Sequence, residues 1–66
     1  MTNVSATVIF QQQTVAAAMR KWGGSFVESL GTALVHADPI NAQKIHDTWP
    51  EIWGEYLNMG VKDARI

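Results

Sequence analysis

The sequence predicts an all-α fold, a compact bundle of three to four short helices that is completed by oligomerisation. Signals that begin helices recur at Ser25, at Asp38-Pro39 and at Thr48-Trp49-Pro50, and the apolar residues between them repeat with a helical period. The chain has 66 residues and no cysteine, and a chain of this size buries only about 60% of its unfolded surface. Because disulfides are excluded, a second copy or a partner chain is expected to supply the missing stability.

Residues 1–10 are predicted to form an extended or frayed arm. Their apolar side chains alternate with polar ones, which suits a strand, but a strand needs a partner that the rest of the chain does not offer. The same region also starts a helical stripe, which consists of Val4, Val8, Val15, Met19 and Trp22. We expect the chain to become helical near Gln11, and a strand, a helix extension and a flexible arm all remain open for residues 1–10.

The first helix is predicted to run from Gln11 to Trp22. Three consecutive alanines favour it, and Arg20 and Lys21 lie in its last turn, where cations complement the helix dipole. Gly23-Gly24 follows directly and is expected to end the helix.

The second helix is predicted to begin at Ser25-Phe26-Val27-Glu28, which matches a capping box. Gly31 lies inside this helix, where glycine costs about 1 kcal/mol relative to alanine. This position indicates that something packs closely against it, and the sequence does not indicate what. The apolar face of the helix is expected to consist of Phe26, Leu30, Ala33, Leu34 and Ala37.

Two further helices are predicted in the second half of the chain. Asp38 is expected to cap a helix over Pro39 to Asp47, with proline in the first helical position. Thr48 and Glu51 form a second capping-box pattern, which begins a helix that ends at Gly60. The apolar residues of that helix have the spacing of one buried stripe: Ile52, Trp53, Tyr56 and Leu57. Residues 11–60 are therefore the predicted helical domain, and residues 61–66 are a C-terminal tail.

Composition argues against two classes of binding. The formal net charge is −1, with five basic and six acidic residues, so binding of nucleic acid through its phosphates is not expected. The sequence lacks the roughly 18 consecutive apolar residues that a membrane-spanning helix needs. Its N-terminus also lacks the basic and apolar regions of a signal peptide. We therefore expect a soluble cytoplasmic protein without a membrane association.

No residue pattern predicts catalysis, a metal or a cofactor. Ser25 has neither a nucleophile elbow nor an acid–base partner at an identifiable spacing. His36 and His46 are the only histidines, and their spacing matches no metal-binding motif. The remaining acidic candidates are spread over helix starts and faces rather than paired: Glu28, Glu51 and Glu55. A non-enzymatic protein without cofactors is the prediction.

Aromatic residues are the main candidates for binding. Three tryptophans are many for 66 residues, and a small core has difficulty enclosing three indoles that bury up to about 250 Å² each. Tryptophan and tyrosine are also enriched as anchors of protein interfaces. Core packing is the alternative for each of them. The candidate interface residues are Trp22, Trp49, Trp53 and Tyr56.

A second hypothesis places an anion at the turn between the first two helices. Backbone N–H groups at a helix start attract phosphate groups, and basic residues precede this turn. A nucleotide or phosphate would be held at a subunit junction, which would make the protein an oligomeric sponge for small ligands. The residues of this alternative site are Arg20, Lys21, Gly23, Gly24 and Ser25.

Three segments between Trp22 and Gly60 carry a resemblance: GSFVESLGTAL at 24–34, HADPIN at 36–41 and TWPEIW at 48–53. Together they resemble a group of small, uncharacterised proteins of bacteriophages and prophages. That group has no established activity, so the resemblance implies a genomic context and a bacterial host cell. By association it implies either an interaction module, including inhibitors of a host defence or regulatory protein, or a structural accessory protein. The partners expected are a second copy of the chain and a host protein.

Overall fold

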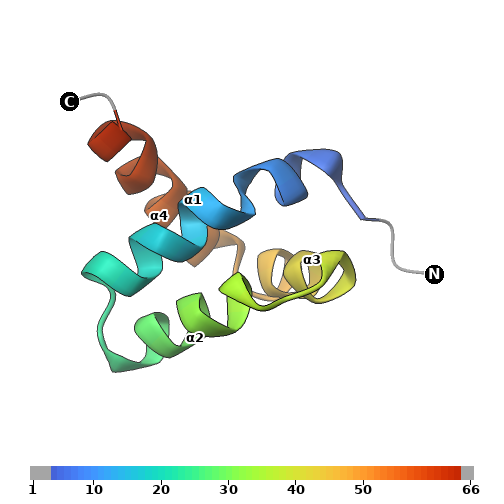
Figure 1. Ribbon diagram of the computed structural model, residues 1–66, viewed down its shortest axis with the longest axis horizontal. Helices are drawn as coiled ribbons and strands as arrows, with labels where there is room; N and C mark the ends of the chain where they lie inside the picture. The colour runs from blue at the N-terminus through green and yellow to red at the C-terminus, as the bar shows by residue number, and fades with distance from the viewer. Residues whose placement is uncertain (1–3, 65–66) are drawn as a thin grey trace.

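The computed structural model describes residues 4–64, which form four α-helices. They are α1 (Ala6–Trp22), α2 (Ser25–Val35), α3 (Pro39–Thr48) and α4 (Pro50–Ala64). No strand occurs within this part of the chain, which confirms the predicted all-α bundle. The long helix α1 crosses the molecule between α2 and α3 on one side and α4 on the other, and it contacts all three (Figure 1).

Helix α1 begins at Ala6 rather than near Gln11, so the expected extended start is wrong for Ala6–Phe10. Of the three alternatives left open for the arm, the helix extension is the one found there. Its N-cap is Ser5, whose hydroxyl accepts a hydrogen bond from the Val8 backbone N–H at 3.4 Å. The helical stripe outweighs the alternation because it buries Val8 in the core, whereas a strand here would have no partner. Residues 1–3 of the predicted arm lie outside the described residues.

The start of α3 agrees with the prediction. The Asp38 carboxylate accepts a hydrogen bond from the Asn41 backbone N–H at 2.8 Å, and Pro39 occupies the first helical position. This cap is local chemistry, because it depends on two residues and on the backbone of the same turn.

The other two predicted caps are wrong. Ser25 is the first residue of α2, and Gly24 occupies the N-cap position without a side-chain hydrogen bond. Thr48 is the last residue of α3 and not the cap of α4. Trp49 joins these two helices, since its N–H donates to Ile45 O and its carbonyl accepts from the Trp53 N–H, both at 3.0 Å. This tight junction leaves no separate residue for a cap.

Two glycines inside helices allow close helix packing. A Cβ atom at Gly31 would lie 2.7 Å from Met19 Cβ, which confirms the close packing predicted there. A Cβ at Gly60 would lie 2.7 Å from Thr14 Cγ2, so this glycine serves the contact between α1 and α4. Helix α4 therefore continues through Gly60 to Ala64. The predicted tail is wrong for residues 61–64, and residues 65–66 lie outside the described part.

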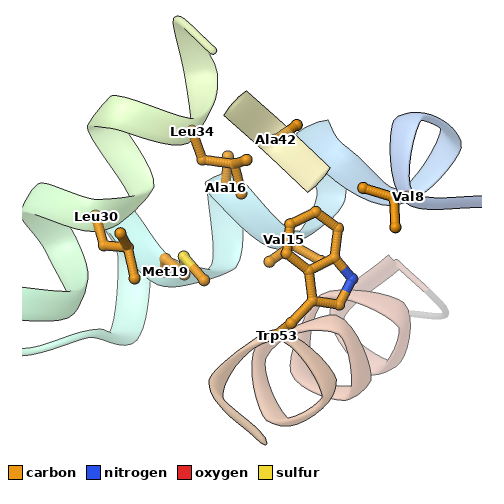
Figure 2. Close-up of a cluster of buried hydrophobic side chains, with 8 residues drawn as sticks. All are labelled: Val8, Val15, Ala16, Met19, Leu30, Leu34, Ala42 and Trp53. Carbon is orange, nitrogen blue, oxygen red and sulfur yellow. The ribbon is translucent and has the colours of Figure 1, made fainter. Parts of the chain in front are cut away.

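The core gathers apolar side chains from all four helices (Figure 2). The indole of Trp53 on α4 lies beside Val8 and Val15 of α1, near the middle of the cluster (Figure 2). Its residue exposure is only 2%. The buried members of the core are Val8, Val15, Ala16, Met19, Leu30, Leu34, Ala42 and Trp53.

Three glutamines connect the helices through hydrogen bonds. The buried Gln12 donates from Nε2 to Leu34 O in the last turn of α2 at 2.8 Å and to Ala37 O beyond that turn at 2.9 Å. Gln11 Oε1 accepts from the Trp53 indole N–H at 3.0 Å. The third, Gln43, accepts at Oε1 from the Ser5 backbone N–H at 2.8 Å and so fixes the start of α1 against α3.

Candidate functional site

The four aromatic residues predicted as interface anchors do not form one surface. Trp53 is in the core, which agrees with the alternative of core packing and not with a role as an interface anchor for this residue. Its indole is enclosed because Gln11 satisfies the polar N–H and α1 covers the ring. Tyr56 is half-buried against the same core. Trp49 and Trp22 reach the surface in two different hollows.

Trp49 lies in a groove between α2 and α3, which we call the α2–α3 groove. Its volume is about 350 Å³, near the lower end of the range for small-molecule sites. Its apolar lining comes from Ala33, Ala37, Ile45 and Trp49, and its polar lining from His36, Asn41, Lys44 and Thr48. One face of α3 and its C-cap residue position most of these residues at helical spacing, Ala33 comes from α2, and His36 and Ala37 come from the turn after α2.

An aromatic pair adjoins this groove. The ring of Phe26, in the first turn of α2, packs edge-on against Trp49 with centroids 5.9 Å apart and an interplanar angle of 68°. Phe26 remains 59% exposed although it belongs to the apolar face predicted for its helix. Sequence reasoning missed Phe26 as a binding candidate. The available signal was its place in the first turn, at the edge of the stripe that packs into the core.

The lining of the α2–α3 groove contains basic side chains and no carboxylate. Lys44 and His36 are the titratable side chains in its lining. Among residues 4–64, the ion pairs join Lys21 to Asp63 and His46 to Asp47, so no described carboxylate neutralises Lys44. The groove therefore presents an apolar floor with an unneutralised ammonium group at its margin.

Trp22 borders a second hollow of about 620 Å³ near the C-terminal half of α4, together with Met59, Lys62 and Asp63. The Lys21 ammonium lies 4.7 Å from the centre of a Trp22 ring and 3.4 Å from the Asp63 carboxylate. One face of the indole and the carboxylate thus already have a partner within the chain. Trp22 is 42% exposed, but the charged groups beside it, Lys21 and Asp63, already pair with each other.

The five residues of the anion hypothesis do not surround a common hollow. Arg20 and Lys21 line a hollow with Ala17, Glu28 and Thr32 between α1 and α2. An anion there would face the Glu28 carboxylate as well as the two cations. Gly23 is required by packing, because a Cβ at this position would collide with Met19 O and Val27. Gly24 and Ser25 are exposed at the start of α2.

His46 takes part in a small polar network on α3. Its Nδ1 lies 2.9 Å from Asp47 Oδ1, which also accepts a hydrogen bond from Gln43 Nε2 at 2.9 Å. The hydrogen bond with His46, followed by that from Gln43, lowers the pKa of Asp47 below its usual value. The imidazole also packs edge-on against Trp53, with ring centroids 5.3 Å apart. These contacts give His46 a structural role.

Within residues 4–64, no group of three histidine, aspartate or glutamate side chains is arranged to hold a metal ion. None of the helices in this range combines the length and the apolar character needed to cross a membrane. Comparisons with protein families, curated proteins and solved structures found no match to this chain.

Proposed function

We propose that this chain is a small protein-binding module that acts by docking a partner protein and not by catalysis. The observation that supports this function best is the exposed Phe26 ring packed on Trp49 at the edge of the α2–α3 groove. Aromatic side chains beside a pocket are the usual anchors of protein interfaces, because their burial on binding removes a large apolar area from water.

The narrower form of this proposal follows from the resemblance to phage and prophage proteins. In that setting the module acts in the bacterial host cell and binds a host protein, such as a defence or regulatory protein that it inhibits. A structural accessory role would use the same surface and differs only in the partner. The alternative of a sponge for anionic ligands has less support, because Glu28 shares the hollow of Arg20 and Lys21.

Site-specific photo-crosslinking tests the proposed surface. The photoreactive residue p-benzoylphenylalanine replaces Phe26 in one variant and Ser29 in a matched variant, and both are expressed in bacterial cells. Ser29 lies on the same helix and is exposed, but it belongs neither to the groove lining nor to the aromatic pair that Phe26 forms with Trp49. We expect a discrete protein adduct from position 26 and none from position 29. Equal crosslinking at both positions, or none at position 26, would contradict the proposal.

A substitution that fills the groove provides a second test of the proposed surface. Ala33→Gln adds a longer side chain to the groove lining, whereas Ser29→Gln adds a similar side chain outside it. Both native residues are exposed, so both variants should keep the fold. We expect only Ala33→Gln to abolish the adduct formed at position 26. Persistence of the adduct in that variant would place the partner elsewhere on the chain.

A further inference from the structure

The length of the α2–α3 groove limits what fits in it. Its α3 side is formed by Asn41, Ile45 and Thr48, which follow one another at helical spacing. At about 1.5 Å of rise per residue, this series spans roughly 10 Å, or two helical turns. Two side chains placed one turn apart on a partner, about 6 Å along its axis, would fit this length.

The backbone of the groove favours a helical occupant over an extended one. One wall is a face of α3, and the other combines Ala33 of α2 with the turn that follows it. Residues 4–64 contain no strand whose edge could pair with an incoming peptide. An extended segment lying on the apolar floor would bury backbone N–H and C=O groups without partners, which is costly. A helix satisfies those groups internally and presents only side chains to the groove.

The floor of the groove is suited to a closely packed helix. Ala33 of α2 and Ala37 of the turn after it are small, so a partner helix can approach this side of the groove without steric conflict. Ile45 and Trp49 offer larger apolar surfaces on the opposite side. Such a combination of small and large residues is how helices interdigitate when they pack.

The charges at the margin indicate the sign of the partner. Lys44 and His36 line the groove, and no carboxylate belongs to its lining. Because Lys44 has no described carboxylate within ion-pair distance, an approaching acidic side chain would gain a new pair without breaking an old one. Complementary charges at the rim of an interface mainly select the partner and speed its association.

We infer that the α2–α3 groove binds an amphipathic α-helix of a partner protein, with two apolar anchors one turn apart and carboxylates on the flank that faces Lys44. This inference rests on the proposed function and names the chemical class of its partner. The expected occupant is an acidic helix. An extended segment, a basic helix and the absence of an occupant are the outcomes that would oppose it.

Two synthetic peptides test the inference. Each is a side-chain-stapled helix with leucines one turn apart, and its flanks carry glutamates in one peptide and lysines in the other. Calorimetry measures the affinity of each for the full chain, and backbone amide NMR shifts locate the contact. We expect the glutamate peptide to shift the amides of Ala33, Ile45 and Trp49 and to bind more tightly than the lysine peptide.

Charge reversal provides the matched control. Lys44→Glu should weaken the glutamate peptide roughly two- to fivefold, the range for one partly exposed ion pair, and should strengthen the lysine peptide. Lys62→Glu makes the same change in net charge outside the groove and should leave both affinities unchanged. Equal effects of the two substitutions, or equal binding of the two peptides in the groove, would overturn the acidic preference. If neither peptide shifts the groove amides, the helical occupant is overturned, whereas the Phe26 crosslink separately decides the proposed function.

Discussion

Gln12 shows how a single polar residue in a small core can be stabilising. Its amide reaches Leu34 O in the last turn of α2 and Ala37 O just beyond it, where carbonyls lack the N–H four residues ahead that a continuing helix would supply. The side chain thereby attaches the end of α2 to the middle of α1. A polar group in this place is favourable only because both hydrogen bonds are formed.

We predict that Gln12→Met destabilises the protein by about 1–3 kcal/mol, because it removes hydrogen bonds to buried carbonyls while keeping the side-chain volume. The neighbouring Gln13 is exposed, so Gln13→Met serves as the control and should change stability by less than about 0.5 kcal/mol. Urea unfolding monitored by circular dichroism measures both. Similar losses in the two variants would show that the Gln12 hydrogen bonds do not stabilise the fold.

The stability of the folded chain is expected to depend on pH through the carboxyl group of Asp47. Hydrogen bonds with His46 and Gln43 lower its pKa in the folded chain, whereas the unfolded value is about 3.9. The stabilisation is therefore fully present above the unfolded pKa and is lost as the pH falls through the folded pKa. We predict that Gln43→Leu raises the pKa of Asp47 toward its usual value, while Gln13→Leu does not. Carbon NMR titration of the carboxyl group measures this, and an unchanged pKa in Gln43→Leu would refute the role of that hydrogen bond.

The helix boundaries show which elements the sequence could predict. The cap at Asp38-Pro39 was correct because its signal is local. The predicted arm and tail are wrong at Ala6–Phe10 and at residues 61–64, because tertiary packing decides where the terminal helices begin and end. Val8 draws the first turn of α1 into the core despite an alternating pattern, and Gly60 permits contact with Thr14 instead of ending α4. Local patterns contain no information about which neighbour a residue will contact.

Gly31 and Gly54 provide a test at the level of helices. Alanine favours a helix over glycine by about 1 kcal/mol, and a Cβ at Gly54 would meet nothing within 4 Å. Gly54→Ala should therefore stabilise the protein by about 1 kcal/mol. At Gly31 the added Cβ would lie 2.7 Å from Met19 Cβ and 3.0 Å from Ala16 O. Overpacking of this kind costs about 1–3 kcal/mol, so Gly31→Ala should be destabilising after the gain in propensity is subtracted.

Thermal unfolding of the two glycine variants measures their stability under identical conditions. Opposite shifts of Tm are expected, upward for Gly54→Ala and downward for Gly31→Ala. Stabilisation by both substitutions would mean that α1 and α2 lie farther apart than the structure places them.

At the scale of the whole molecule, the composition indicates more tryptophan than a small core can easily enclose, but it does not indicate where each aromatic residue lies. The expectation that some aromatic surface remains outside the core is met by Phe26 and Trp22. Trp53 is enclosed because Gln11 accepts its N–H from the adjacent helix, and that pairing joins residues far apart in sequence. The groove itself depends on the relative placement of α2 and α3, which no local motif specifies.

The single chain reaches ordinary compactness. Its radius of gyration is 11.0 Å, close to the value of about 11 Å expected for a folded domain of this length. The core described above lies within one chain, and completion of the bundle by oligomerisation stays a prediction. An interface of usual size covers about 800 Å² per partner, which is roughly a fifth of the 4405 Å² of accessible surface.

Self-association of the chain remains a prediction, and Phe10 is the residue that we expect to anchor it. Phe10 is 87% exposed on α1, beside the exposed Ile9 and on a different helix from the α2–α3 groove. Burial of a full aromatic side chain contributes about 1.5–3 kcal/mol to association. We predict that the average mass of the wild-type protein rises with concentration in sedimentation velocity, whereas Phe10→Gln keeps the mass of one chain.

Ile40→Gln is the matched control, because Ile40 is also a large exposed apolar residue, at 49%, but lies on α3. It should leave the concentration dependence intact. Phe10→Gln should not change unfolding at high dilution, since the ring has few contacts to lose within one chain. A wild-type protein that keeps the mass of one chain at every concentration would end the oligomer hypothesis. An Ile40→Gln variant as monomeric as Phe10→Gln would instead show that association depends on general apolar exposure and has no anchor at α1. A loss confined to Phe10→Gln would place self-association on α1, away from the α2–α3 groove, which stays free for a different partner.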